Sequence, residues 1–210
     1  MKKQYLLTPG PTPIPPNILE VGSRPIIHHR TPQFRAILKE AEEGLKYVFQ
    51  TRNDIFIFAS SGTGAMEAAV SNLLSPGDFA LTIEGGKFGE RWTEICRAYG
   101  INAEVVAVEW GEAVDSGVIE ERLKSNSKIK AVFSTLCETS TGVTYDIRAL
   151  GEVVRNTGAV LVVDAVSGLG AVATNSKDTS NAIKATSSEI TFSEGILPNI
   201  LPRISLIFAQ

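Results

Sequence analysis

The feature of this sequence that most constrains its fold is a regular alternation of apolar, strand-like runs with amphipathic, helix-like runs. The strand-like runs are apolar at consecutive positions, which is typical of strands buried on both faces. The order predicts an α/β domain with a mostly parallel sheet covered by helices on both sides. The predicted strands are Ile55–Ala59, Phe79–Ile83, Ala103–Val108, Ala131–Leu136 and Ala159–Val163, and the predicted helices are Gly64–Leu74, Phe88–Tyr99, Gly117–Asn126 and Ile147–Asn156.

The segments outside this alternation differ in composition. The stretch "TPGPTPIPP" is rich in proline, which fixes φ and removes backbone donors, so we expect an extended N-terminal arm. A long helix is predicted from Phe34 to Phe49, with Thr31 as its cap and Pro32 in its first turn. The tail is rich in Ser, Thr and Asn and then apolar with two prolines, and no element is assigned to it. The expected organisation is an arm (residues 1–20), a partial large domain (21–174) and an atypical tail (175–210).

Composition excludes several classes of function. A net charge of −3 on 210 residues offers no basic excess for a nucleic acid. No apolar run reaches the length of a membrane span, and the N-terminus has no signal-peptide core, so a cytoplasmic protein with no membrane partner is expected. Cys96 and Cys137 form no C-x-x-C pair and have no nearby His, so we interpret them as reduced core or near-core residues.

The first strand end, "SSGTGAME", has the pattern of an anion site. Glycines at 62 and 64 allow the backbone to approach an anion, and a helix from about Gly64 directs free N–H groups at it. The spacing matches neither a dinucleotide motif nor a Walker motif. A plain strand–turn–helix junction with glycines for packing remains the alternative.

Two further strand ends carry groups that suit a flat, polar ligand. In "EGGKFGERW", Phe88 stands between glycines, where it either stacks on a flat ligand or anchors the helix in the core. In "TLCETSTGVTYDI", five hydroxyls follow an apolar run, and they either donate to a phosphate or phenolic oxygen or form a turn that leads to a helix cap at Asp146. Ligands of parallel sheets bind at this end of the strands.

Asp164 is the most informative residue of the chain. It ends the apolar run "AVLVV", where a carboxylate is costly unless it has a cationic partner or several donors. The protonated ring nitrogen of a cofactor would be such a partner. A helix cap or a metal ligand is the alternative, although no carboxylate or His cluster accompanies Asp164 to suggest a metal.

These strand ends, taken together and in this order, resemble the class V aminotransferases, which depend on pyridoxal 5'-phosphate (PLP). The resemblance is to the alanine–glyoxylate and serine–pyruvate branch and covers about residues 5–173, through "LTPGPTPIPP", "HHRTPQF", "SGTGAMEAAVSNLLSPGD", "GKFGERW", "ETSTGV" and "VDAVSGLGA". It implies the large domain of the PLP-transferase fold (fold type I). It also implies a homodimer that transfers an amino group from a small amino acid (alanine or serine) to a 2-oxo acid (glyoxylate or pyruvate).

The resemblance also implies a role for individual residues. Asp164 matches the aspartate that pairs with the pyridine nitrogen. It is the one residue of this chain to which the resemblance gives a catalytic role. "HHRTPQF" matches a segment that approaches the partner subunit. The other matches are Thr63, Gly64 and Ala65 for the phosphate, Phe88 and Val166 for the two faces of the ring, Thr139 beside the ring, and Pro9 and Gly10 for the substrate pocket.

The match fails after about residue 174. The family's Schiff-base lysine lies in a "Ser-x-x-Lys" or "Ser-Gln-Lys" context, which neither Lys177 nor Lys184 has, and Arg203 is a poor stand-in for the substrate-carboxylate arginine. The family's C-terminal part is expected to be missing, and activity to be impaired. A shift of one nucleotide across "SEG" and "PRI" can restore Gln-Lys and Pro-Gly, so the tail is interpreted as frame-shifted family sequence. The alternatives are a non-catalytic fragment or binding protein that retains the phosphate pocket, and another class V PLP enzyme such as a cysteine desulfurase-like lyase.

Overall fold

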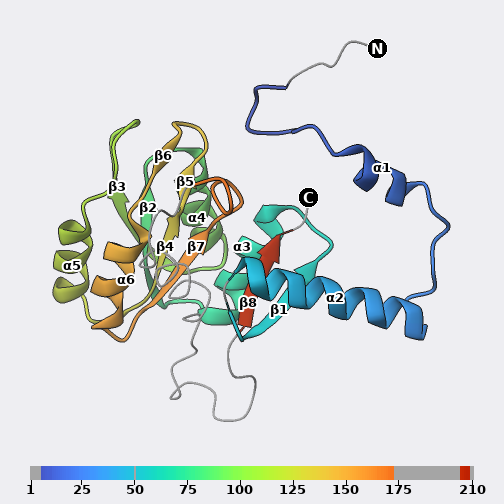
Figure 1. The fold of residues 1–210 in the computed structure, drawn as a ribbon. Helices are drawn as coiled ribbons and strands as arrows, with labels where there is room; N and C mark the ends of the chain where they lie inside the picture. The colour runs from blue at the N-terminus through green and yellow to red at the C-terminus, as the bar shows by residue number, and fades with distance from the viewer. Residues whose placement is uncertain (1–5, 50, 173–203, 209–210) are drawn as a thin grey trace. The chain divides into compact units, whose positions relative to one another are not determined.

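The computed structural model describes residues 6–49, 51–172 and 204–208, the last of these by their backbone. The chain forms two compact units, residues 1–44 and 45–210, and each is described by itself. Figure 1 shows the order of the elements along the chain, from blue at the N-terminus to red at the C-terminus.

The first unit contains the proline-rich segment. Residues 6–15 form no helix or strand, but a short helix, α1, spans Pro16–Gly22. The extended conformation predicted for the proline-rich stretch, residues 8–16, is therefore wrong only at its last residue, where α1 begins. A proline at the first helical position loses no hydrogen bond, because that N–H has no partner inside the helix. The second helix, α2, spans Pro32–Val48 as predicted, and the Thr31 hydroxyl caps it by accepting from the Phe34 N–H at 3.3 Å.

The second unit is built on a four-stranded sheet in which every strand is parallel. Its strands are β2 (Phe79–Glu84), β3 (Asn102–Ala107), β4 (Ile129–Thr135) and β7 (Val160–Asp164), in the order β3-β2-β4-β7. The sequence prediction of a parallel sheet is confirmed. The first predicted strand forms as β1 (Asp54–Phe58) but pairs in parallel with β8 (Ile204–Phe208) in a separate two-stranded sheet.

Helices cover both faces of the four-stranded sheet, as predicted. They are α3 (Gly62–Leu73), α4 (Lys87–Ala98), α5 (Ser116–Ser125) and α6 (Ile147–Arg155), and Figure 1 shows α5 and α6 together on one side of it. Alternate residues of each strand enter two separate cores, as the two-residue period of a strand requires. Ala131 and Phe133 pack with α3 and α4, whereas Val132 packs with α5 and α6.

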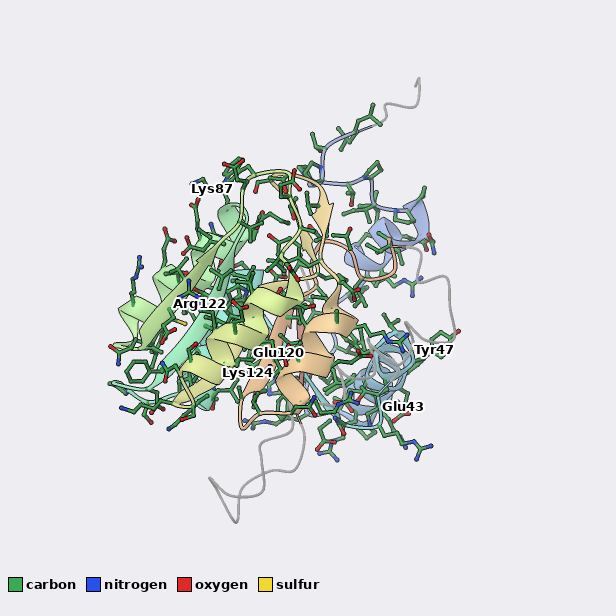
Figure 2. All side chains as sticks on the ribbon, turned by 90° about the vertical axis from the view of Figure 1, so that its left-hand side faces the viewer. Glu43, Tyr47, Lys87, Glu120, Arg122 and Lys124 are labelled. Carbon is green, nitrogen blue, oxygen red and sulfur yellow. The ribbon has the colours of Figure 1, made fainter. Side chains whose placement is uncertain are left out.

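Two capping carboxylates set the starts of α5 and α6. Asp115 Oδ1 accepts from the Gly117 N–H at 2.9 Å, and Asp146 Oδ1 accepts from the Ala149 N–H at 3.0 Å. The second bond confirms the predicted cap at Asp146, while the first was not predicted. On the outer surface of α5, Glu120 and Lys124 lie side by side and form an ion pair of 2.6 Å (Figure 2).

A small hairpin follows β4 and was not predicted. Its strands, β5 (Cys137–Glu138) and β6 (Val143–Thr144), pair antiparallel, and Gly142 in the turn has φ +77°, a conformation that favours glycine. Cys96 is buried and Cys137 half-buried, and neither forms a disulfide, in agreement with the sequence interpretation. Within the part of the chain that the structure describes, no helix has the length and apolarity needed to cross a membrane.

Candidate functional site

Four of the predicted site residues of the second unit lie at the carboxyl ends of β2, β4 and β7, whereas Thr63, Gly64 and Ala65 lie at the start of α3, after β1. Phe88 lies in the first turn of α4 after β2, Thr139 lies in the hairpin after β4, and Asp164 ends β7 with Val166 two residues later. Because β4 lies between β2 and β7, the three strand ends meet at one edge of the sheet. The candidate residues thus lie just after the strands, at the end of a parallel sheet where ligands bind.

Asp164 is a buried carboxylate with few stabilising partners. Its residue is 7% exposed, and the Val166 N–H donates to its Oδ1 at 2.9 Å. Burial raises the pKa of Asp164 above its usual value; the Val166 bond and Arg91 oppose this rise, whereas the Glu138 charge adds to it. A cation placed against this carboxylate would therefore stabilise its ionised form.

Glu138 is a second buried carboxylate beside Asp164, and sequence reasoning missed it. It is fully buried, and its oxygens accept from the backbone N–H groups of Gly89 at 3.0 Å and Phe88 at 3.4 Å. They also accept from the N–H of Ser140 at 3.2 Å and from its hydroxyl at 2.6 Å. The signal was the same as for Asp164, because Glu138 is also a carboxylate that follows closely on a buried apolar strand.

The glycines around Phe88 have a specific packing reason. A Cβ atom on Gly86 would lie 2.3 Å from Ser140 Oγ and 2.6 Å from Glu138 Cδ, and one on Gly89 would lie 2.4 Å from the Ile83 carbonyl oxygen. These contacts are too short for any side chain. The glycines thus let the start of α4 lie against β2 and the hairpin.

Arg91 connects the starts of α3 and α4, and it too was not predicted. Its guanidinium donates to Thr63 Oγ1 at 3.1 Å and lies 5.6 Å from the centre of the Phe88 ring. Phe88 itself is half-buried. The Arg91 side chain therefore contacts both Thr63 and Phe88 and places a positive charge between them.

The first turn of α3 has amide groups without a side-chain cap. Ser61 precedes the helix but makes no capping bond, and the Ser60 hydroxyl donates to the Ser61 carbonyl instead. The Gly64 N–H donates to the same carbonyl at 3.0 Å, while Ala65 is fully buried against the core. Uncapped N–H groups at a helix start attract anions, so this end of α3 suits a phosphate.

Hydroxyl groups gather near Asp164. Thr139 Oγ1 donates to Ser167 Oγ at 2.5 Å, which joins the hairpin to the loop after β7. The side-chain oxygens of Thr135 and Tyr145 are buried without a hydrogen-bond partner. Burial, and then the Glu138 charge, raise the pKa of Tyr145 to about 12, so its hydroxyl keeps its proton at neutral pH. Val166, by contrast, is 48% exposed and offers an aliphatic surface.

The remaining predicted residues belong to the first unit or lie outside the described residues. Pro9 and Gly10 are exposed in the first unit, as is the segment with the stacked rings of His28 and His29. Their roles at a substrate pocket and a partner subunit stay predictions. Lys177, Lys184, Arg203 and the two places of the suggested frame shift lie outside the described residues. In the described part of the chain, no cluster of His, Cys, Asp and Glu could hold a metal ion.

The arrangement suits a ligand with an anionic end, a flat body and a cationic end. The uncapped start of α3 and Arg91 offer positive potential at one place, and the buried Asp164 offers a carboxylate at another. Phe88 and Val166 contribute an aromatic ring and an aliphatic side chain, and Thr139 contributes a hydroxyl.

Comparisons with known proteins agree on one family. The family model described as aminotransferase class-V matches residues 4–188. Among curated proteins, the chain is 44% identical over 172 residues to a soluble hydrogenase 42 kDa subunit of Anabaena cylindrica, covering 80% of this chain and 45% of that protein. It is 43% identical over 168 residues to an uncharacterized aminotransferase of Methanocaldococcus jannaschii, covering 80% and 44%. It is 37% identical over 175 residues to a serine–glyoxylate aminotransferase of Methylorubrum extorquens, covering 81% and 44%.

Solved structures show the same fold. An alanine–glyoxylate aminotransferase from Nostoc sp. superposes with a TM-score of 0.74 at 31% identity, covering 81% of this chain and 45% of that one. The chain thus spans somewhat less than half the length of the relatives that it matches. It has the α/β architecture of the PLP-transferase large domain. On the sequence and on the structure, this chain belongs to the class V aminotransferase family.

Proposed function

We propose that residues 51–172 hold the cofactor of a PLP-dependent aminotransferase. In the complete site, an amino group passes between a small amino acid (alanine or serine) and a 2-oxo acid (glyoxylate or pyruvate). The names of the relatives from Methylorubrum extorquens and Nostoc sp. support this substrate class. When bound, PLP supplies a pyridine ring that withdraws electrons from the carbon that bears the amino group.

The observation that carries the proposal is the buried carboxylate of Asp164. Its pKa is raised by burial, and the side-chain acceptor Oδ1 has one backbone donor at 2.9 Å. A protonated ring nitrogen supplies both a hydrogen-bond donor and a positive charge, which such a carboxylate requires. In return, Asp164 keeps the proton on that nitrogen, so that the ring retains its positive charge.

The other end of PLP is a phosphate, which the start of α3 fits. Thr63, Gly64 and Ala65 occupy its first turn, where Ser61 supplies no side-chain cap. The Arg91 guanidinium, 3.1 Å from Thr63 Oγ1, adds a fixed positive charge at this end. Phe88 and Val166 would cover the two faces of the ring, and the Thr139 hydroxyl would lie at its edge.

The finer features of the proposal concern the whole enzyme. We place it in the cytoplasm, as a homodimer that acts on small molecules, with Pro9 and Gly10 lining the substrate pocket. Neither Lys177 nor Lys184 stands in the sequence context of the family's lysine. We therefore expect this chain to hold PLP without a covalent bond and to be impaired in turnover. If the tail is frame-shifted, the coding DNA will restore a Gln-Lys motif after a shift of one nucleotide.

The test is direct measurement of PLP binding to the 210-residue chain. Equilibrium dialysis should show one PLP per chain, and Asp164→Ala should weaken that binding about tenfold or more, because the ring nitrogen loses a charged partner. Glu152→Gln removes an exposed carboxylate on α6 and should leave the affinity unchanged. Saturable binding that is equal in the wild type and in Asp164→Ala would refute the proposed orientation of the ring.

A reduction experiment tests the lysine. After treatment with borohydride and denaturation, PLP should separate from the chain, because no lysine holds it. PLP fixed to Lys177 or Lys184 would instead show that the tail supplies the missing group.

A further inference from the structure

We propose that Glu138 is a positioning residue of this site, whose buried carboxylate fixes the start of α4 so that Phe88 is held in place to contact a flat ring. This inference rests on the proposed PLP site and goes beyond it, because the resemblance assigns Glu138 no role. It is carried by four hydrogen bonds to one fully buried side chain.

The Glu138 carboxylate caps the start of α4, which the N-cap residue of that helix cannot do. Gly86 precedes the helix and has no side chain to cap it, so the first N–H groups would be left without acceptors. Glu138, which lies about 50 residues further along the chain, accepts from the N–H groups of Phe88 and Gly89. A buried carboxylate at a helix start is also favoured by the helix dipole. The cap thus comes from another strand of the fold.

Ser140 extends this connection to the first residue of the helix. Its hydroxyl donates to Glu138 Oε1 at 2.6 Å and accepts from the Lys87 N–H at 3.1 Å. Three consecutive amides, those of Lys87, Phe88 and Gly89, are therefore held by the hairpin after β4. The Lys87 side chain, by contrast, points outward, away from the sheet (Figure 2), and pairs with Glu90.

Close packing leaves this arrangement little freedom. A Cβ atom on Gly86 would lie 2.6 Å from Glu138 Cδ, and one on Gly85 would lie 1.9 Å from Tyr145 Oη. The backbone before Phe88 is thus in contact with the hairpin. Phe88 lies two residues after Gly86 and donates its own N–H to Glu138, so a shift of its backbone would disturb both contacts with the hairpin.

The position of Glu138 also couples the aromatic residue to the carboxylate of the site. The Glu138 charge contributes to the raised pKa of Asp164. The hydroxyl of Thr139, the residue after Glu138, donates to Ser167 in the loop after β7. A shift of the hairpin would therefore reach both groups that are proposed to meet the ring. The four hydrogen bonds that Glu138 accepts come from α4 and the hairpin, and none of them comes from α3, which forms the phosphate end.

The first test measures the clamp itself by hydrogen exchange of backbone amides. In Glu138→Ala, the amides of Phe88 and Gly89 should exchange about tenfold faster or more, since each loses a charged acceptor, while the Val132 amide in the sheet keeps its rate. Glu152→Gln changes the net charge equally and should alter neither. Unchanged exchange at Phe88 and Gly89 would overturn the proposal.

The second test separates positioning from general stability. PLP affinity should fall about tenfold in Glu138→Ala, whereas the affinity for inorganic phosphate, measured by its competition with PLP, should stay within about twofold. A purely structural defect would weaken both ligands together, and that result would overturn the proposal. Ser140→Ala removes one donor to Glu138, so it should also weaken PLP binding more than phosphate binding, but by less than Glu138→Ala does. It replaces Glu138→Ala in this test if that variant does not fold.

The two levels of inference fail in different ways. If the wild-type chain binds no PLP, the proposed function is refuted, and the role of Glu138 toward the ring is refuted with it. If PLP binds to the wild type and Glu138→Ala binds it equally well, the proposed function stands and Glu138 is only a structural cap.

Discussion

Replacing Gly89 with alanine tests how closely the start of α4 lies against β2. A Cβ atom at this position would lie 2.4 Å from the Ile83 carbonyl oxygen and 3.0 Å from the Glu84 Cα. Both are backbone atoms of the sheet, so neither can rotate away. The first turn of α4 must therefore move outward, and its bond from the Gly89 N–H to Glu138 must lengthen from 3.0 Å.

The expected change in the free energy of unfolding combines one stabilising effect with two destabilising ones. Alanine is favoured over glycine in a helix by about 1 kcal/mol. Overpacking of a close contact costs about 1–3 kcal/mol, and a weakened hydrogen bond to a charged acceptor costs about 1.5–3 kcal/mol. The free energy of unfolding of Gly89→Ala should thus fall by about 1.5–5 kcal/mol.

Urea unfolding, followed by far-UV circular dichroism and by tryptophan fluorescence, measures this change. The control is Gly44→Ala in α2, where a Cβ atom would meet nothing within 4 Å. It should raise the stability of its helix by about 0.5–1 kcal/mol, because only helix propensity changes. If Gly89→Ala unfolds at the same urea concentration as the wild type or a higher one, the reasoning on the close approach is wrong.

Three further predictions concern buried groups. Burial raises the pKa of Asp164, so the native state binds its proton more tightly than the unfolded chain does, and ionisation destabilises the fold as pH rises. Ligand-free Asp164→Asn should therefore be more stable than wild type at pH 7, and urea unfolding should show the difference closing below about pH 4; a difference independent of pH would contradict this. Tyr145→Phe removes a buried hydroxyl without a partner and should keep the stability or raise it by up to about 1 kcal/mol in the same assay. A larger loss would mean that the hydroxyl has a partner. Burial raises the pKa of Cys96 to about 12, so a thiol reagent should modify half-buried Cys137 first and Cys96 only in denaturant; equal rates would contradict the buried position.

Much of the sheet could be predicted because local pattern and tertiary environment agree. The run Ala131–Leu136 begins with three apolar residues, and the structure buries these between two helical layers in β4. Asp164 was conspicuous for the same reason, since a carboxylate at the end of a buried strand needs an explanation. Residues whose role depends on their own strand were thus within reach of the sequence.

The missed features depend on contacts between distant segments or on very short elements. Glu138 acts through amides about 50 residues away, and nothing in the spacing of "ETSTG" reveals that distance. Its hairpin has strands of two residues each, too short to show a period. The helix α1 was hidden by the prolines before it, of which Pro15 is its N-cap and Pro16 its first residue. The pairing of β1 with β8 joins segments about 150 residues apart, which no local pattern predicts.

The position of β7 at the end of the sheet order has a consequence for self-association. Within residues 51–172, β7 pairs with β4 on one side and with no strand on the other. The outer backbone groups of a strand at the edge of a sheet are a template on which another extended segment, from the same chain or from a second one, can add. The strand that offers this template also ends in Asp164. A segment that adds there would lie directly beside the strand whose carboxyl end carries the proposed partner of the ring nitrogen.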